Sequence, residues 1–369
     1  MNKVFRYRLY PTRAQETALN HTLDLCRWVY NETLATRRNA YEATKIFPYS
    51  KHTLYSRYDT QRLLLLWKEQ QPTLTSVYSQ VLQEIQYRVD LAFKAFFRRV
   101  KAGEKAGYPR FKGKGWYDSF TYPQSGFALD GSTLQLSKIG SVKIKLHRPI
   151  AGEIKRLNIK RSSTGKWFAC FTVECEPNIL EHTNDAAVGI DVGLTSFATL
   201  SNGEHINNPR FFRAEEKQLA KAQRKKSKKV VAKVHERIAN KRSNFAHQLS
   251  RKLVNTYGVI AFEDLNIKGM MQNRYLAKSI GDVAWSQFIA FTQNKAENAG
   301  SVVVMVDPKN TTQECSRCGA IVKKELKDRT HSCDCGLVLD RDENAAKNIL
   351  TRGLSCFRQQ TAIEAACVS

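Results

Sequence analysis

The chain has 369 residues and a strong positive charge, with 59 Lys and Arg against 34 Asp and Glu and a formal net charge of +25. Hydrophobic residues make up 42% of the sequence, which excludes a disordered basic tail and leaves ample apolar surface for a folded core. The charge favours a polyanionic partner, because lysines and arginines near phosphates release condensed counterions. We therefore expect a folded protein that binds nucleic acid.

Local patterns point away from membrane and secreted proteins. The longest apolar run, residues 63–67, is much shorter than the ~20 residues of a membrane span, and residues 1–6 lack the apolar segment of a signal peptide. Four of the nine cysteines crowd into residues 315–335, which favours metal binding in a reducing compartment over a disulfide framework. We therefore expect a cytoplasmic protein.

The first hundred residues predict a strand followed by helices. Residues 5–10 alternate basic and apolar side chains, which is typical of a strand, and Thr12 with Gln15 predicts a capping box for the next helix. Two segments then carry apolar residues at helical spacing, which predicts buried helix faces. These residues are Leu19, Leu23, Cys26, Tyr30 and Leu34 in the first segment, and Val81, Ile85, Val89 and Phe93 in the second, after Pro72.

Segment 94–114 is strongly basic, with eight Lys and Arg against one Glu, and its glycines and proline break any helix. Aromatic residues lie among these charges. Rings that stack on bases and cations that hold phosphates are typical of nucleic-acid surfaces, but a solvated loop anchored by its rings explains the pattern equally well. The candidate nucleic-acid contacts here are Tyr108, Arg110 and Lys112.

From residue 119 to residue 175 the apolar residues recur with a period of two, in several short runs. This pattern predicts a small barrel or sandwich, which the N-terminal strand joins with the helices inserted between. We assign residues 176–185 as a linker. Strands and helices then alternate, and segment 213–252, with fourteen Lys and Arg and three Glu, predicts long helices broken near Ser227. Further strands are predicted at 188–191, 197–200, 259–262 and 302–306, and further helices at 285–299 and 344–350.

Three carboxylates follow apolar runs in this alternating region: Asp191, Glu263 and Asp342. A packed core can hold such residues at the rim of a sheet, where their mutual repulsion calls for cations between them. Two Mg²⁺ ions (or Mn²⁺) about 4 Å apart would satisfy the acids and cut a phosphodiester bond, one activating the attacking water and the other stabilising the leaving oxygen. Taken singly, the acids also fit a turn residue, an exposed strand end and a helix cap respectively, and Asp340 competes with Asp342.

Four cysteines have the spacing of a zinc site. Cys315 and Cys318 form a CxxC pair, and after fourteen residues Cys333 and Cys335 form a shortened CxC pair; a glycine follows each pair. Four thiolates close the coordination shell of Zn²⁺ and stabilise a short segment by on the order of 10 kcal/mol. We predict a structural zinc ion, with His331 as an alternative ligand.

Together these motifs resemble those of the TnpB (OrfB) proteins of bacterial insertion sequences. The likeness spans residues 1 to about 352 and has one departure, the shortened CxC pair. It rests on residues 7–12, 107–112, 189–194 (first RuvC motif), 262–266 (second RuvC motif), 310–319 with 333–336 (zinc finger) and 340–349 (third RuvC motif).

The resemblance implies an RNA-guided DNA endonuclease related to the type V CRISPR effectors. Such proteins bind a noncoding guide RNA from the transposon end, recognise a short flanking motif in double-stranded DNA, and cut at a single RuvC site. The catalytic, Mg²⁺-binding acids of the family correspond to Asp191, Glu263 and Asp342, which favours Asp342 over Asp340.

The resemblance also implies an α+β multidomain fold. A β-barrel wedge domain with an inserted helical recognition domain is followed by an RNase H-like RuvC α/β domain that carries a zinc finger. The corresponding segments are 1–10 and 104–180 for the wedge, 11–103 for the recognition domain, 185–310 and 337–352 for RuvC, 311–336 for the zinc finger and 353–369 for a tail.

In the family, the recognition helices and the wedge contact the flanking motif, so Gln80 and Thr121 are candidate base contacts. A Gln pairs bidentately with adenine, although a solvent-facing role suits Gln80 as well. A second candidate nucleic-acid surface lies in segment 213–252, with Arg224, Lys225, Lys226, Lys228 and Lys229 at its centre. The expected active form is a monomer with its RNA, associated with the nucleoid.

Two other functions remain open. An RNA-guided DNA-binding repressor that does not cleave would be expected to lack one or more of the acids, and this chain keeps all three. An RNase H-like transposase that acts without RNA would join element ends directly.

Overall fold

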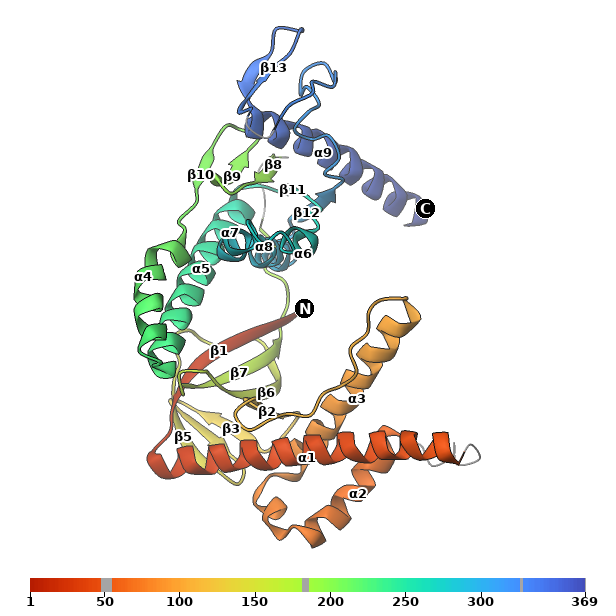
Figure 1. Cartoon of the computed structure of the whole chain (residues 1–369), viewed down its shortest axis with the longest axis vertical. Coiled ribbons are helices and arrows are strands. Elements are labelled where there is room, and N and C mark those ends of the chain that lie inside the picture. Colours follow the sequence, from red (N-terminus) through yellow and green to blue (C-terminus); the bar gives the residue numbers. More distant parts are fainter. Residues whose placement is uncertain (48–54, 181–185, 326–327, 369) are drawn as a thin grey trace. The chain divides into compact units, whose positions relative to one another are not determined.

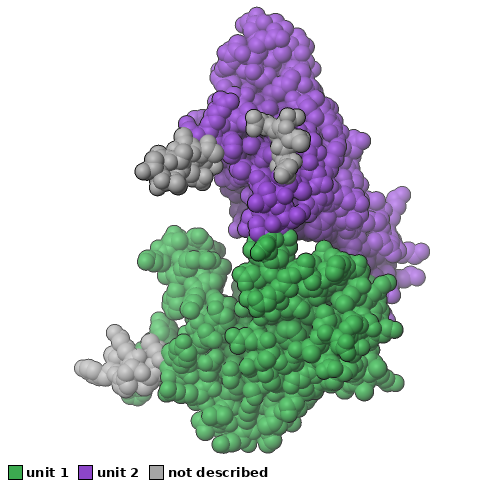
Figure 2. Space-filling view, turned by 180° about the vertical axis from the view of Figure 1, so that it is seen from behind, with its two compact units in different colours: residues 1–176 green, residues 177–369 purple. Residues whose placement is uncertain are grey.

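The computed structural model describes residues 1–47, 55–180, 186–325 and 328–368. The chain forms two compact units, residues 1–176 and 177–369, which are coloured separately in Figure 2. Each unit has its own β-sheet and its own hydrophobic core. Part of the predicted linker, residues 181–185, lies outside the described residues. Among the described helices, length and hydropathy nowhere reach what a membrane crossing needs.

Unit 1 contains a seven-stranded antiparallel sheet. Its strands are β1 (Asn2–Tyr10), β2 (Ser119–Tyr122), β3 (Phe127–Asp130), β4 (Thr133–Leu136), β5 (Gly140–Lys145), β6 (Glu153–Arg161) and β7 (Trp167–Glu174). The order is β2-β6-β7-β1-β5-β4-β3, so the N-terminal strand lies in the middle of the sheet (Figure 1). The edge strands β2 and β3 follow each other in the chain, and the rings of Tyr122 and Phe127 lie 6.3 Å apart. The sheet is therefore nearly closed.

The helices of unit 1 are inserted between β1 and β2. They are α1 (Arg13–Ile46), α2 (Arg57–Gln70), the 3-10 helix η2 (Pro72–Ser76) and α3 (Ser79–Lys101). The predicted capping box is present: the Thr12 hydroxyl accepts the Gln15 N–H at 3.3 Å, and the Gln15 side chain accepts the Thr12 N–H at 3.0 Å. The apolar residues predicted on the two helix faces are all buried.

Unit 2 contains a five-stranded mixed sheet with the order β10-β9-β8-β11-β12. Its strands are β8 (Ala187–Val192), β9 (Ser196–Leu200), β10 (His205–Asn207), β11 (Val259–Glu263) and β12 (Val302–Val306). β8, β11 and β12 run parallel, while β9 and β10 complete an antiparallel edge. A separate two-stranded hairpin consists of β13 (Thr330–Ser332) and β14 (Val338–Asp340).

Helices connect and cover this sheet. They are α4 (Phe211–Arg224), α5 (Lys228–Thr256), α6 (Ile267–Met270), α7 (Ala277–Val283), α8 (Trp285–Ala299) and α9 (Arg341–Val368). α5 and α8 cover one face, where Ile190, Phe262 and Phe288 share a core. α9 covers the other face, where Ala261 and Ile349 belong to a second cluster. The break predicted near Ser227 separates α4 from α5, and α9 is much longer than the predicted helix at 344–350.

Candidate active site and metal centre

The carboxyl ends of two parallel strands bring Asp191 and Glu263 to one edge of the unit 2 sheet. In the register of β8 and β11, Ile190 lies beside Phe262. Both of these side chains belong to the core under α5 and α8. Because side chains alternate along a strand, Asp191 and Glu263 point to the opposite face, the one that α9 covers.

Gly189 sets how closely α9 approaches this face. A Cβ atom at Gly189 would lie 2.1 Å from the carbonyl oxygen of Ala346 and 2.5 Å from the backbone nitrogen of Leu350, so a glycine lets the helix backbone rest directly on β8. Asp342 precedes Ala346 by about one helical turn, and Asp191 follows Gly189 on the same face of the strand. The close contact therefore carries Asp342 toward Asp191.

The three carboxylates share a poorly solvated site. Asp191 is half-buried, and its pKa is raised well above its ordinary value, first by loss of solvation and then by the negative charges of Glu263 and Asp342. Burial also raises the pKa of Glu263, while the Thr311 hydroxyl opposes that shift by donating a hydrogen bond to its carboxylate. An excess of negative charge at a buried edge is typical of a site that binds cations.

The beginning of α9 separates the roles of Asp340 and Asp342. One carboxylate oxygen of Asp340 accepts the backbone N–H groups of Asp342 at 2.9 Å and of Glu343 at 3.1 Å, which caps the helix. The Asp342 carboxylate instead pairs with Arg341 at 3.0 Å, and its charge acts on Asp191 more strongly than that of Asp340. The capping role considered for Asp342 therefore belongs to Asp340.

The chemistry of this donor set fits hard divalent cations such as Mg²⁺, which prefer carboxylate oxygens. Among the described residues, the cysteine cluster is the one group of three or more potential ligands close enough together to hold a metal ion. A pair of Mg²⁺ ions at the three acids therefore stays a prediction.

The four predicted cysteines come together as a group. Cys333 and Cys335 belong to the turn between β13 and β14, and the four sulfur atoms lie within 4.8 Å of one another. The Sγ–Sγ distance is 3.6 Å both from Cys315 to Cys335 and from Cys318 to Cys333. A tetrahedral zinc site with Zn–S bonds of about 2.3 Å has sulfur atoms about 3.8 Å apart. The shortened CxC pair is thus compatible with four-thiolate zinc binding.

His331 is buried beside these cysteines but outside the four-thiolate group, and its Nδ1 contacts the amine of Lys324. Burial raises the pKa of Cys315, but hydrogen bonds from the backbones of Cys318 and Arg317 and from the His331 side chain lower it to about 5. The thiolate is the form of cysteine that binds zinc. Four thiolates complete a zinc shell by themselves, and the alternative role of His331 as a ligand stays a prediction.

Two asparagines tie the cysteine segment to α9. The Asn344 side chain donates to the carbonyl of Glu314 at 2.7 Å and accepts the N–H of Ser316 at 3.0 Å. The Asn348 side chain donates to the carbonyls of Thr311 at 2.8 Å and Glu314 at 2.7 Å. The segment that leads into the cysteine cluster thus braces the first turns of the helix that carries the third carboxylate.

Comparisons with known proteins identify the family. Three family models match: an OrfB "Helix-turn-helix domain" over residues 1–45, an OrfB "Probable transposase" over 170–274, and a "Cas12f1-like, TNB domain" over 285–349. A Streptomyces pristinaespiralis protein named "Putative RNA-guided DNA endonuclease" is 34% identical, across 96% of this chain and 90% of that protein. The chain belongs to the TnpB (OrfB) family.

A second TnpB-type relative, "Putative RNA-guided DNA endonuclease InsQ" of Escherichia coli, is 30% identical, across 95% of this chain and 92% of that protein. A cryo-EM structure of a Cas12f1–sgRNA–target DNA complex is 16% identical, covers 95% of this chain and 99% of that one, and has a TM-score of 0.36. That score is too low to transfer the role of any residue. In this TnpB chain, residues 1–45 form β1 and most of α1 rather than a helix-turn-helix.

The aromatic and basic candidates near residue 110 differ in their surroundings. The Tyr108 ring lies 5.3 Å from that of Phe96 and is 38% exposed. The Lys112 backbone exchanges two hydrogen bonds with the side chain of Asn31, at 2.8 and 3.0 Å. Arg110 is exposed. Tyr108 and Lys112 thus anchor the loop to the helices, and nucleic-acid binding by these residues stays a prediction.

The two candidate base contacts also differ. Thr121 is only 3% exposed, and its hydroxyl accepts hydrogen bonds from Arg88 at 2.7 Å and Asn158 at 3.3 Å. Thr121 lies on the face of β2 opposite Phe120 and Tyr122, and Arg88 of α3 covers it there, so a base contact by Thr121 is not available in this structure. Gln80 is half-buried in the first turn of α3 and accepts a hydrogen bond from Ser125 at 3.3 Å. Its base contact stays a prediction.

The cations predicted at the centre of segment 213–252 lie where α4 gives way to α5, which pack side by side through Leu219, Val234 and Ile238 (Figure 1). We call residues 224–229 the basic turn. Its five cations are all exposed, as a phosphate-binding surface requires: Arg224, Lys225, Lys226, Lys228 and Lys229.

Proposed function

We propose that this protein is an RNA-guided DNA endonuclease that cuts target DNA at one site formed by Asp191, Glu263 and Asp342. The observation that carries this proposal is the gathering of the three acids on one face, where burial and mutual repulsion raise the pKa of Asp191. The similarity of nearly the whole chain to two proteins named as putative RNA-guided DNA endonucleases supports it.

The three acids would hold two Mg²⁺ ions, or Mn²⁺. When bound, such ions supply activation of the attacking water and stabilisation of the leaving 3′ oxygen. The chain's part is to fix the ligands before the substrate arrives. Thr311 orients the Glu263 carboxylate by its hydrogen bond, and the glycine contact between β8 and α9 sets the approach of Asp342.

The four cysteines would hold a structural Zn²⁺ ion, because their thiolates complete a tetrahedral shell. Zinc would order the segment that Asn344 and Asn348 connect to the start of α9. The metal would therefore support the position of Asp342 without taking part in the chemistry.

The partners in this proposal are a noncoding guide RNA and double-stranded target DNA with a short flanking motif, bound by a protein monomer. Base pairing with the guide selects the target, while the protein grips phosphate backbones. The basic turn and the exposed Arg110 offer cations for that grip, so binding should weaken with rising salt.

Alanine substitution of the acids tests the proposal. Wild type and the variants Asp191→Ala, Glu263→Ala and Asp342→Ala are assembled with guide RNA and given matched DNA and Mg²⁺. Each variant should cut at least ~100-fold more slowly, because loss of a metal ligand costs more than loss of a group that only orients one. Each should bind RNA and target DNA as the wild type does.

Asp264→Ala is the matched control, because Asp264 follows Glu263 directly but is exposed. It should cut at the wild-type rate. Equal losses in Asp264→Ala and Glu263→Ala, or loss of RNA binding in Asp191→Ala, would contradict the assigned roles. A wild-type complex that binds matched DNA with Mg²⁺ and never cuts would support the repressor instead.

A further inference from the structure

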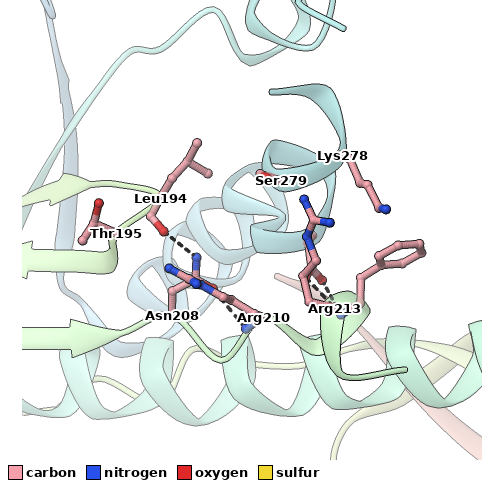
Figure 3. Close-up of a pocket in the computed structure, with 9 residues that line it drawn as sticks. Leu194, Thr195, Asn208, Arg210, Arg213, Lys278 and Ser279 are labelled. Atoms are coloured by element: carbon pink, nitrogen blue, oxygen red, sulfur yellow. Dashed lines mark hydrogen bonds between the residues drawn. The ribbon is translucent and has the colours of Figure 1, made fainter. Parts of the chain in front are cut away.

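Unit 2 contains a second polar feature, a cavity of about 550 Å³ beyond the end of β8 (Figure 3). Three segments line it: the β8–β9 turn, the residues that lead into α4, and α7. Its polar lining consists of Thr195, Asn208, Arg210, Arg213, Lys278, Ser279 and the carboxylate of Asp282. Neither the proposed chemistry nor the sequence patterns account for this concentration of cations.

The charges around the cavity do not cancel. Arg213 and Lys278 share a single carboxylate, that of Glu216. Arg242 faces the buried carboxylate of Asp282 at 3.6 Å. Arg210 has no side-chain hydrogen bond or ion pair among the described residues, so the three cations of the lining, with Arg242 beside it, face two carboxylates. The excess of two positive charges suits a phosphate group.

The backbone at Arg210 is held in a costly conformation. Its φ of 45° lies in the left-handed region, which a residue with a Cβ atom rarely adopts. The Asn208 side chain maintains it by accepting the Arg210 N–H at 3.2 Å and donating to the Leu194 carbonyl at 2.9 Å. Strained residues persist where the surroundings fix them, and they are frequent in binding sites.

The side chains, and not the N-terminus of α4, are the binding groups of the cavity. The Phe212 N–H in the first turn of α4 already donates to both oxygens of Asp282, at 2.9 and 3.0 Å. The donors that line the cavity are the guanidinium groups of Arg210 and Arg213, the Lys278 amine, and the hydroxyls of Thr195 and Ser279. A fork of N–H groups with neighbouring hydroxyls matches the oxygens of a phosphodiester.

We propose that this cavity binds one phosphodiester of the target DNA strand, close to the bond that is cut. Thr195 follows Asp191 by four residues, so the two lie at most about 14 Å apart along the chain. A strand whose scissile bond lies at the acids would then reach the cavity within a few nucleotides. This inference rests on the proposed endonuclease function, and it adds a positioning site for the DNA backbone.

Variants that change one charge distinguish DNA binding by this cavity from the general attraction between a basic protein and DNA. Arg210→Gln removes one charge and no internal contact, whereas Arg210→Lys keeps the charge. Lys217→Gln is the control, because Lys217 is an exposed residue of α4 outside the cavity lining. In buffer without Mg²⁺ and with a fluorescent single-stranded DNA, Arg210→Gln should bind about tenfold more weakly, Arg210→Lys should recover most of the affinity, and Lys217→Gln should match the wild type. Melting temperatures confirm that each variant is folded.

Methylphosphonates, which replace a charged phosphate of the DNA backbone by an uncharged group, can identify the phosphate that the cavity binds. Target strands that carry one methylphosphonate at successive positions near the cut are offered to the guided, Mg²⁺-loaded complex. In the wild type, one position should slow cutting about tenfold. In Arg210→Gln, cutting of unmodified DNA should be about tenfold slower, and the same methylphosphonate should have no further effect.

Three results would contradict parts of this proposal. An Arg210→Gln variant that binds and responds like Lys217→Gln overturns it. If no position of the target strand is sensitive in the wild type, or if the same position is equally sensitive in Arg210→Gln, the assignment to a target-strand phosphate is overturned. If the wild-type complex never cuts, the proposed endonuclease function fails, and the binding comparison without Mg²⁺ still decides whether the cavity holds a DNA phosphate.

Discussion

Replacing Gly189 by alanine is the most direct perturbation of the geometry that brings the acids together. The new Cβ would lie 2.1 Å from the Ala346 oxygen and 2.9 Å from the Leu350 Cα, and both are backbone atoms that no rotamer change can move. α9 would have to retreat from β8 by about 1 Å to restore ordinary contact. Overpacking of this kind costs about 3 kcal/mol, which lowers Tm by roughly 6–12 °C for a unit of this size.

Activity should fall further than stability suggests, because Asp342 is carried on the displaced helix. A misplacement of about 1 Å costs on the order of 100-fold in rate. The assays are thermal unfolding and guided DNA cleavage, with Gly281→Ala as the control, since a Cβ there meets only the Met271 methyl at 3.8 Å. A Gly189→Ala protein that melts within 1 °C of wild type and cuts normally would refute the packing of α9 on β8.

Three other predictions test the metals and the charges. Asp191→Asn should raise the Tm of the zinc-loaded, Mg²⁺-free protein at neutral pH. Because the folded-state pKa of Asp191 is raised, its negative charge costs stability as pH rises above the ordinary value near 4, and the gain should vanish in acid scans. Cys318→Ser should reduce the amount of bound zinc, measured by metal analysis, and lower Tm by at least about 5 °C. Because Cys318 is exposed, its replacement leaves no cavity, so the loss of stability would come from the loss of zinc; the control Cys175→Ser should retain zinc. Neutralising all five cations of the basic turn should reduce the slope of log affinity for guide RNA against log salt by up to about four, and an unchanged slope would make the basic turn a solvated face.

Site residues could be predicted from the sequence wherever a short pattern determines where a side chain lies in the fold. Strand-end carboxylates could be recognised because β-strands with apolar runs end where polar residues begin, and the thiol ligands because zinc binding restricts their spacing. Choosing between Asp340 and Asp342 required the family motif, since both lie at the same helix start. The structure supplies the physical reason for choosing Asp342, because the Asp340 carboxylate accepts hydrogen bonds from the backbone N–H groups that begin α9.

Features that depend on tertiary packing were not predictable. α2 escaped detection because its run of leucines has two exposed members, Leu65 and Leu66, which disrupt the helical period. The bond from Thr311 to Glu263 joins residues 48 apart, and no spacing rule connects them. The burial of Thr121, a predicted base contact, depends on Arg88 of α3, which lies 33 residues away in the chain and covers that face of β2. Likewise, the cations of the unit 2 cavity come from two segments separated by more than sixty residues.

Guide reprogramming tests the central claim most directly. The protein is purified with RNA transcribed from its flanking DNA, the guide segment is replaced by either of two unrelated sequences, and each complex meets two plasmids that differ only in the matched target. Each complex should cut only its matched plasmid with Mg²⁺, and neither should cut when Asp191 is replaced by alanine. Cutting or joining of DNA without RNA, or cutting that ignores the guide, would contradict the account and favour an RNA-independent transposase.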